Sequence, residues 1–222
     1  MARYLVNAGF WLVLFAPQSE TPTDQAGVPF VDRVVEFKKG QGGGFNEGKL
    51  PEIVLGPPHG TGATIGGSHV LSLGREGSIT LEFVDNEVID GEGVDLLIFE
   101  NSIKPAPNNG AVDPGYDLAK VEVSADGLTW KTFAFDTGTR TGCAGHQPVY
   151  SNPETDEGRD LSPTDPKTAG GEGFDIAELG FKVVRFVRIT DLGLSTLGGK
   201  TTQGFDLDAV AAVHSRARAA KK

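Results

Sequence analysis

The sequence is poor in the residues that most often build metal or redox sites. Its 222 residues include one cysteine, Cys143, and four histidines. A single cysteine cannot form a disulfide within the chain, and no Cys and His spacing of a structural zinc site is present. Stability must therefore come from packing, together with any ions that oxygen ligands hold.

Aromatic and basic residues are also scarce. Phe, Trp and Tyr make up 8% of the chain, and 20 Lys and Arg stand against 30 Asp and Glu, for a net charge of −10. An acidic surface repels phosphate backbones, so the charge argues against a nucleic-acid partner and favours the attraction of cations. The small number of aromatic residues argues against a broad platform for stacking sugars.

Long apolar runs are missing as well, since a comfortable transmembrane helix needs about 20 residues. The longest run, Tyr4 to Ala16, follows Arg3 and leads into a polar, Pro-containing stretch, which is the order of a secretory signal peptide. The alternative is an N-terminal strand or helix packed on the core. We expect residues 1–29 to be a signal peptide and polar linker. The mature protein would then be extracellular, on the cell surface or periplasmic, with no integral membrane span.

Glycine is abundant, with 31 residues, and proline adds 13. From Val34 onward, short runs of β-branched and aromatic residues alternate with Gly, Pro, Asn and Asp, which is typical of a β-sandwich or barrel. We expect an all-β fold, a two-sheet antiparallel β-sandwich with long irregular loops. It would form one domain over residues 30–215, followed by a basic tail at 216–222.

Eight segments have the composition of strands. Asp95 to Asn101 is the most apolar and is expected to be central. Asp126-Gly127 predicts a hairpin with a type I′ turn. Phe174 to Leu179 is expected to form one or two helical turns. Besides Asp95 to Asn101, the predicted strands are Val34 to Lys38, His69 to Leu73, Ser78 to Phe83, Lys120 to Ser124, Thr129 to Phe135, Lys182 to Thr190 and Phe205 to His214.

Carboxylates crowd around two of these strands. Residues 85–100 hold six carboxylates and no Lys or Arg. In the last strand, period-2 alternation puts Asp206, Asp208 and Val210 on one face and Phe205, Leu207 and Ala209 on the other. Like charges placed so closely repel one another unless they are solvated or bridged by a cation.

Calcium is the cation that this donor set favours, because hard oxygen ligands suit Ca²⁺ better than softer metals. The alternative is that the carboxylates bind loop amides or pair with Arg185 and Arg188. The sequence predicts a structural calcium ion with ligands drawn from Asp90, Asp95, Glu100, Asp206 and Asp208.

Several segments resemble known proteins. Val121 to Trp130 (VEVSADGLTW) resembles a hairpin of discoidin-type, galactose-binding-like jelly rolls, and Val184 to Asp191 resembles their Arg-containing strand. Leu50 to Pro58, Val94 to Asn101 and Gly204 to Val210 follow one another in an order similar to that of a bacterial family usually labelled "cell surface protein".

The resemblance implies a jelly roll on the outside of a bacterium, often with a structural calcium ion. In related jelly rolls, loops at one end bind sugars or cell surfaces. The chain departs from the anchored members because it ends in a basic tail, where they have a C-terminal sorting helix.

Three functions follow from these observations. The first is an exported, calcium-stabilised and non-catalytic module that binds carbohydrate or another cell-surface ligand through the long loops Gly40 to Gly67 and Asp136 to Gly173. The second is a polysaccharide hydrolase or lyase, and the third is a purely structural surface module. For the enzyme, the acid and base would be two of Asp90, Asp95, Glu100, Asp175 and His146.

Overall fold

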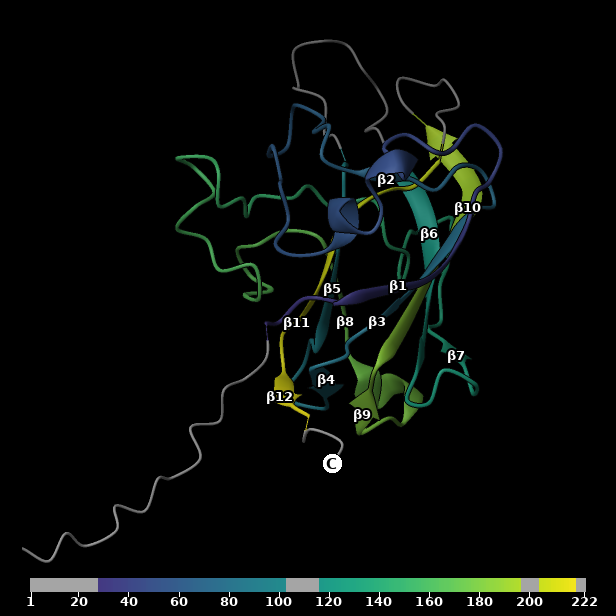
Figure 1. The fold of residues 1–222 in the computed structure, drawn as a ribbon, viewed down its shortest axis with the longest axis vertical. Helices are drawn as coiled ribbons and strands as arrows, with labels where there is room; N and C mark the ends of the chain where they lie inside the picture. The colour runs from purple at the N-terminus through teal and green to yellow at the C-terminus, as the bar shows by residue number, and fades with distance from the viewer. Residues whose placement is uncertain (1–27, 103–115, 197–203, 219–222) are drawn as a thin grey trace, which may run out of the picture.

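The computed structural model describes residues 28–102, 116–196 and 204–218. The expected signal peptide and the last four residues of the basic tail lie outside these ranges. The described part is an all-β, antiparallel sandwich, as predicted (Figure 1). Its helical content consists of three 3₁₀ turns: η1 (Glu47–Lys49), η2 (Glu52–Val54) and η3 (Ile176–Leu179).

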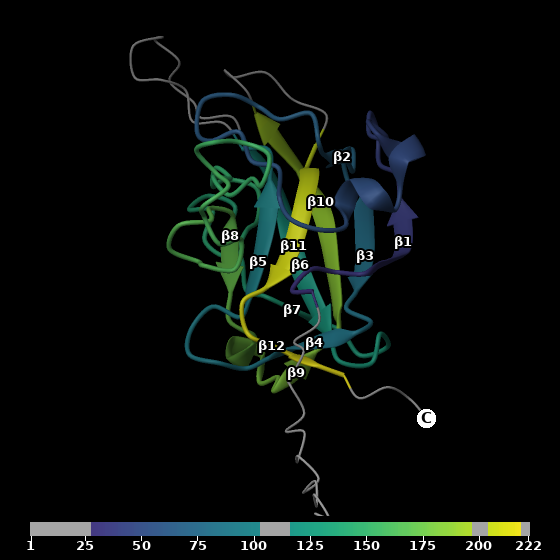
Figure 2. The same ribbon diagram turned by 60° about the vertical axis from the view of Figure 1, so that its left-hand side comes forward.

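Two large sheets face each other, and a small third sheet closes one end of the sandwich (Figure 2). The first has the order β1 (Arg33–Lys38), β3 (Ser78–Glu82), β10 (Phe186–Thr196), β6 (Tyr116–Ser124) and β7 (Lys131–Thr132). The second has the order β2 (Leu71–Ser72), β11 (Asp206–Ala212), β5 (Leu96–Glu100) and β8 (Glu172–Phe174). The third has the order β12 (Ser215–Ala217), β4 (Asn86–Ile89) and β9 (Val183–Val184).

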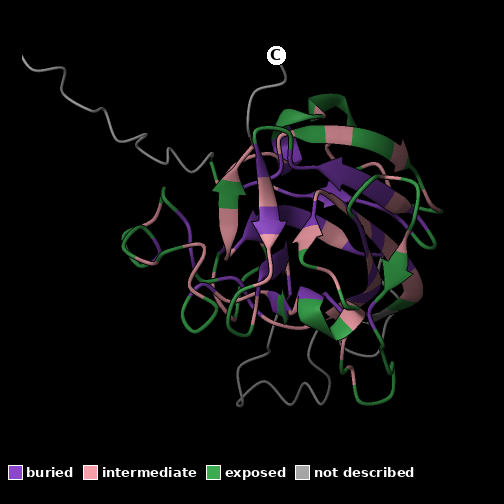
Figure 3. Cartoon of the chain, turned by 90° about the horizontal axis from the view of Figure 1, so that it is seen from below, coloured by how far each residue is buried: buried purple, intermediate pink, exposed green. Residues whose placement is uncertain are grey.

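The main core lies between the two large sheets. Alternate residues of β6 and β10, such as Val121 and Ile189, meet Ile98 of β5 and Leu207 of β11 in one cluster of buried side chains. Figure 3 shows these buried strands inside a rim of exposed loops. Burial of this apolar surface supplies most of the stability, at about 25 cal/mol per Å².

Strand β5 is central, as predicted, and all five of its residues are buried. Its inner face joins the main core. Its outer face, with Leu97 and Phe99, packs in a second cluster under Phe30, Val149 and Ala169. The long segment that follows β7 therefore covers the outside of this sheet, and it ends where β8 begins.

The structure confirms the predicted hairpin, but the prediction of a type I′ turn is wrong. Strands β6 and β7 pair with Glu122 opposite Thr132. Of the two turn residues, only Gly127 has a positive φ, 77°, whereas a type I′ turn needs both. Instead, Oδ1 of Asp126 accepts the backbone N–H groups of Leu128 and Thr129 at 2.8 and 2.7 Å. The Asp126 side chain thus stabilises the turn by accepting two of its backbone N–H groups.

The predicted alternation along β11 is also wrong beyond Leu207. The pairing with β5 shifts between Leu207 and Ala209, so Asp208 is the extra residue of a β-bulge. Val210 consequently joins Leu207 in the main core, while Ala209 turns to the outer cluster. Asp208 leaves the regular ladder at this point.

Candidate functional site

Carboxylates gather where the inner faces of the two large sheets meet, at the end of the sandwich opposite the small sheet. Glu100 ends β5, Asp117 lies at the start of β6, and Asp206 begins β11. One carboxylate oxygen from each lies within 4.8 Å of the others. We call these three residues the carboxylate trio.

The strand pattern explains why two of these charges, those of Glu100 and Asp117, point inward. Glu100 has the same parity as the core residue Ile98, and Asp117 has the same parity as the core residues Ala119 and Val121. The apolar interior of the sandwich therefore ends in negative charge at this place.

Glu100 is the most perturbed member of the trio. It is 1% exposed, and its Oε2 has no hydrogen-bond partner among the residues that the structure describes. Burial raises its pKa well above the usual range, and the charges of Asp117, Asp206 and Glu172 raise it further. Burial also raises the pKa of Asp206. A cation at this place would remove the repulsion and supply the missing partner of Oε2.

Glu172, at the start of β8, adds a fourth charge beside the trio. Its carboxylate accepts the backbone N–H groups of Gly145, His146 and Gln147 at 3.0, 2.8 and 2.5 Å. These bonds hold the loop at residues 145–147 against the same end of the sandwich.

Asp208 lies next to the trio without joining it. Its two carboxylate oxygens accept the backbone N–H of His59 at 3.0 and 2.9 Å. Burial raises its pKa to about 7. Asp208, Glu100 and Asn101 line a small cavity of about 10 Å³, which has room for about one water molecule or ion and none for an organic substrate.

The structure places Asp90 and Asp95 elsewhere. Asp95 precedes β5, so the five residues of that strand, roughly 17 Å, separate it from Glu100. Asp95 is buried and accepts from the backbone of Gly91 and Ile176 at 2.8 and 3.0 Å, and it contacts Nδ1 of His214 at 2.8 Å. These partners account for its burial without a cation.

Asp90 and Asp175 complete a second acidic group around Asp95. Asp90 pairs with Lys182, and Asp175 accepts the backbone N–H of Ala177 at the start of η3. Both side chains thus have structural partners. The acidic residues considered for an enzyme are divided between the two ends of the sandwich.

Of the predicted ligands, the structure brings together Glu100 and Asp206, with Asp208 beside them. Sequence reasoning missed Asp117 and Glu172. Asp117 could have been found from its period-2 relation to Val121 and Val123. Glu172 gave no such signal, because β8 has three residues and was not recognised as a strand.

Cys143 and His146 line a separate hollow of about 280 Å³ with Arg140 and Glu172. Cys143 is buried, and burial raises the pKa of its thiol, with further contributions from Asp136 and Glu172. A raised pKa keeps the sulfur protonated, which is the reverse of what a nucleophile needs.

A groove of about 730 Å³ lies between two of the long loops. The segment from Gly60 to Ile65 forms one wall, and residues between Tyr150 and Thr168 form the other. Tyr150 is 43% exposed. The remaining polar lining consists of hydroxyl groups and one pair of opposite charges, contributed by Thr61, Thr64, Thr155, Thr168, Glu157 and Lys167.

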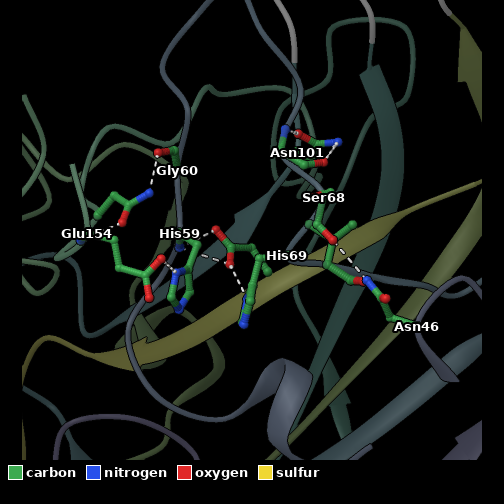
Figure 4. Close-up of polar contacts among 11 residues, drawn as sticks. Asn46, His59, Gly60, Ser68, His69, Asn101 and Glu154 are labelled. Atoms are coloured by element: carbon green, nitrogen blue, oxygen red, sulfur yellow. Dashed lines mark hydrogen bonds and ion pairs between the residues drawn. The ribbon is translucent and has the colours of Figure 1, made fainter. Parts of the chain in front are cut away.

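Hydrogen bonds tie the two walls of the groove together. The N–H of Gly62 donates to the carbonyl oxygen of Val149 at 2.9 Å. The Nδ2 group of Asn152 donates to the carbonyl oxygen of Gly60 at 2.9 Å (Figure 4). The first wall is further fixed by Asn101, whose amide exchanges hydrogen bonds with the backbone of Gly67. The groove is therefore largely preformed. Its first wall is hydrogen-bonded to Asn101, the residue that follows Glu100.

No protein-family model matches the sequence, and a comparison with curated proteins gives no match either. The functional argument therefore rests on the geometry of the carboxylate trio and the groove. Within the described residues, no helix has the length and apolar character needed to cross a membrane.

Proposed function

We propose that the protein is a calcium-stabilised binding module that takes a carbohydrate in the groove between its two long loops. The observation that carries the proposal is the groove itself, with a half-exposed tyrosine ring surrounded by threonine hydroxyls. Its volume of about 730 Å³ falls in the range of small-ligand sites, roughly 300–1,000 Å³.

The chemistry of the lining suits a sugar. The face of Tyr150 can stack on the C–H surface of a pyranose ring, and its hydroxyl remains available for a polar contact. Thr64 can both donate and accept hydrogen bonds, as sugar hydroxyls require. The hydroxyls of Thr61 and Thr168 donate to Ile65 and Asp165, and they offer acceptor oxygens to a ligand. Glu157 and Lys167 add one strong acceptor and one strong donor.

The calcium ion would be held by the carboxylate trio of Glu100, Asp117 and Asp206. Its role would be structural, since it would neutralise the charge at the end of the core. Binding is favoured over hydrolysis because Glu100 and Asp208, two carboxyls whose pKa burial raises, face a cavity too small for a sugar ring. The leader-like sequence at residues 1–29 supports an exported, extracellular or cell-surface setting.

The test is a glycan-array screen of the full chain in Ca²⁺, followed by titration calorimetry with the glycan that binds best. Tyr150→Ala should weaken binding about tenfold, since an aromatic contact of this kind contributes about 1.4 kcal/mol. Leu128→Ala is the matched control, because Leu128 is 85% exposed and lies in the β6–β7 turn, away from the groove. Unchanged affinity in Tyr150→Ala, or no glycan bound at all, would contradict the proposal.

A further inference from the structure

The first wall of the groove is anchored at one end by the residue that follows β5. We call residues 59–67 the wall segment. The side-chain oxygen of Asn101 accepts the N–H of Gly67 at 2.5 Å, and its amide group donates to the carbonyl oxygen of Gly67 at 3.1 Å (Figure 4). Asn101 directly follows Glu100, the member of the carboxylate trio that ends β5. A shift of Glu100 would therefore reach the wall segment through one peptide bond and two hydrogen bonds.

Strand β11 anchors the other end of the wall segment. The N–H of His59 donates to both carboxylate oxygens of Asp208, at 3.0 and 2.9 Å (Figure 4). Asp208 is the extra residue of the β-bulge and stands two residues after Asp206, another member of the trio. Because a bulge sets the direction of the side chain that it carries, the orientation of Asp208 depends on how this end of β11 is held. Both anchors of the wall segment thus depend on the positions of trio residues.

The trio links the two large sheets at this end of the sandwich. Glu100 and Asp206 belong to the second sheet, and Asp117 belongs to the first. Without an ion, three carboxylate oxygens within 4.8 Å of one another repel, and Oε2 of Glu100 is buried without a partner among the described residues. An ion bound to all three carboxylates would hold the ends of β5, β6 and β11 together. Ion binding therefore opposes the separation of these strand ends.

The wall segment lacks buried side chains between its two anchors. Residues 61–67 are all exposed or half-buried. Their contacts with the second wall include the N–H of Gly62, which donates to the carbonyl oxygen of Val149 at 2.9 Å. Segments with few buried apolar contacts and exposed backbone hydrogen bonds are those that open most readily. The anchors at Asn101 and Asp208 therefore decide how well this side of the groove is ordered.

We propose that Ca²⁺ binding at the carboxylate trio orders the wall segment and thereby raises the affinity of the groove for its ligand. The inference rests on the proposed function, from which it takes both the ion and the groove, and it adds a regulatory role to the structural one. Because coupling between two binding sites is reciprocal, a groove ligand would raise the affinity of the trio for Ca²⁺ by the same factor. Couplings of this kind typically amount to about 5–150-fold.

Hydrogen exchange of the full chain measures the ordering without any groove ligand. Backbone amide exchange is followed at saturating Ca²⁺ and in EDTA. The N–H groups of Gly62 and Gly67 should exchange at least about fivefold more slowly with Ca²⁺. The N–H groups of Leu128 and Thr129, which donate to Asp126 at the opposite end of β6, are the reference and should change little. Amides of the central strand β10 report any global stabilisation.

Two asparagine variants separate the coupling from a loss of local structure. Asn101→Ala removes the link between β5 and the wall segment, so Ca²⁺ should slow the exchange of Gly62 much less than in the wild type. Asn46→Ala is the matched control. Asn46 donates to the carbonyl oxygens of Ser68 and Val70, at 2.9 and 2.8 Å, just beyond the wall segment, but it is not adjacent to any trio residue in the sequence. This variant should speed exchange both with and without Ca²⁺ and keep the wild-type response to the ion.

The wild-type comparison decides the question even where a variant fails to fold. Exchange in the wall segment that does not depend on Ca²⁺, or an equal slowing in the wall segment, the β6–β7 turn and β10, would overturn the coupling and leave the proposed function intact. An equal Ca²⁺ response in Asn101→Ala and Asn46→Ala would also overturn it.

Two further outcomes concern the proposed function itself. If the protein binds no Ca²⁺, the ion and the coupling fail together. If Ca²⁺ slows exchange in the wall segment while the glycan array gives no binding, the ordering by Ca²⁺ is supported and the assignment of a carbohydrate ligand is contradicted.

Discussion

Asp208 shows how one buried side chain can set the pH dependence of the whole protein. Its pKa is raised by burial from 3.8 to about 7, so the folded state holds this proton more tightly than the unfolded state does. The stabilisation from this proton is complete below about pH 4 and is lost as the pH rises toward 7. Its full size is about 4 kcal/mol.

This shift predicts the behaviour of Asp208→Asn in EDTA. Asn is neutral and keeps an acceptor oxygen for the N–H of His59. The wild type should therefore lose more free energy of unfolding between pH 5 and pH 8 than the variant does, with a difference of a few kcal/mol. Urea titrations at the two pH values measure this difference. If the free energy of unfolding changed equally between pH 5 and pH 8 in the two proteins, Asp208 would have an ordinary pKa in the folded state.

Among the secondary-structure elements, β10 illustrates how a carboxylate can replace regular pairing. The pairing of β10 with β6 shifts between Asp191 and Leu194. At that irregularity, Asp191 is buried and accepts the backbone N–H groups of Glu76, Gly193 and Phe205 at 2.9, 2.7 and 2.9 Å. Its carboxylate thus joins three segments just ahead of Asp206.

Asp191→Ala should lower the free energy of unfolding by about 2–3 kcal/mol, because the buried N–H of Phe205 loses its acceptor, at a cost of about 1–3 kcal/mol, and two partly buried N–H groups lose theirs. Asp191→Asn keeps one acceptor oxygen and should cost less. Urea unfolding at pH 7 compares the two variants with the wild type. A loss below about 1 kcal/mol in the alanine variant would mean that water replaces the carboxylate.

The same elements show what the sequence could predict. Strands β3, β5 and β11 were anticipated within a few residues, since their apolar patterns are strong. Strand β6 was placed correctly but runs further, from Tyr116 to Ser124. Short strands such as β4 and β8 were not expected, because three or four residues show no periodicity. The bulge at Asp208 was invisible for a related reason: a register shift depends on the partner strand.

At the scale of the whole molecule, the fold class could be predicted from composition. The position of the carboxylate trio could not, because it depends on which strand ends lie next to each other. Glu100 and Asp206 were recognised because each stands at the end of a strongly apolar strand. Asp95 was an equally good candidate by composition, but it lies at the opposite end of β5 and is satisfied by backbone donors. Sequence alone gives no measure of that distance, because it arises from the pairing of segments far apart in the chain.

A calcium titration of EDTA-treated protein at pH 7.5, followed by its melting temperature, tests the central claim most directly. At Ca²⁺ concentrations 100-fold above the Kd, the gain is about 2.7 kcal/mol, which corresponds to about 5–10 °C for a protein of this size. Glu100→Gln should melt higher than the wild type in EDTA and should not respond to Ca²⁺, whereas Glu36→Gln, on exposed β1, should respond normally. A wild-type melting temperature that stays constant up to millimolar Ca²⁺ would contradict the account.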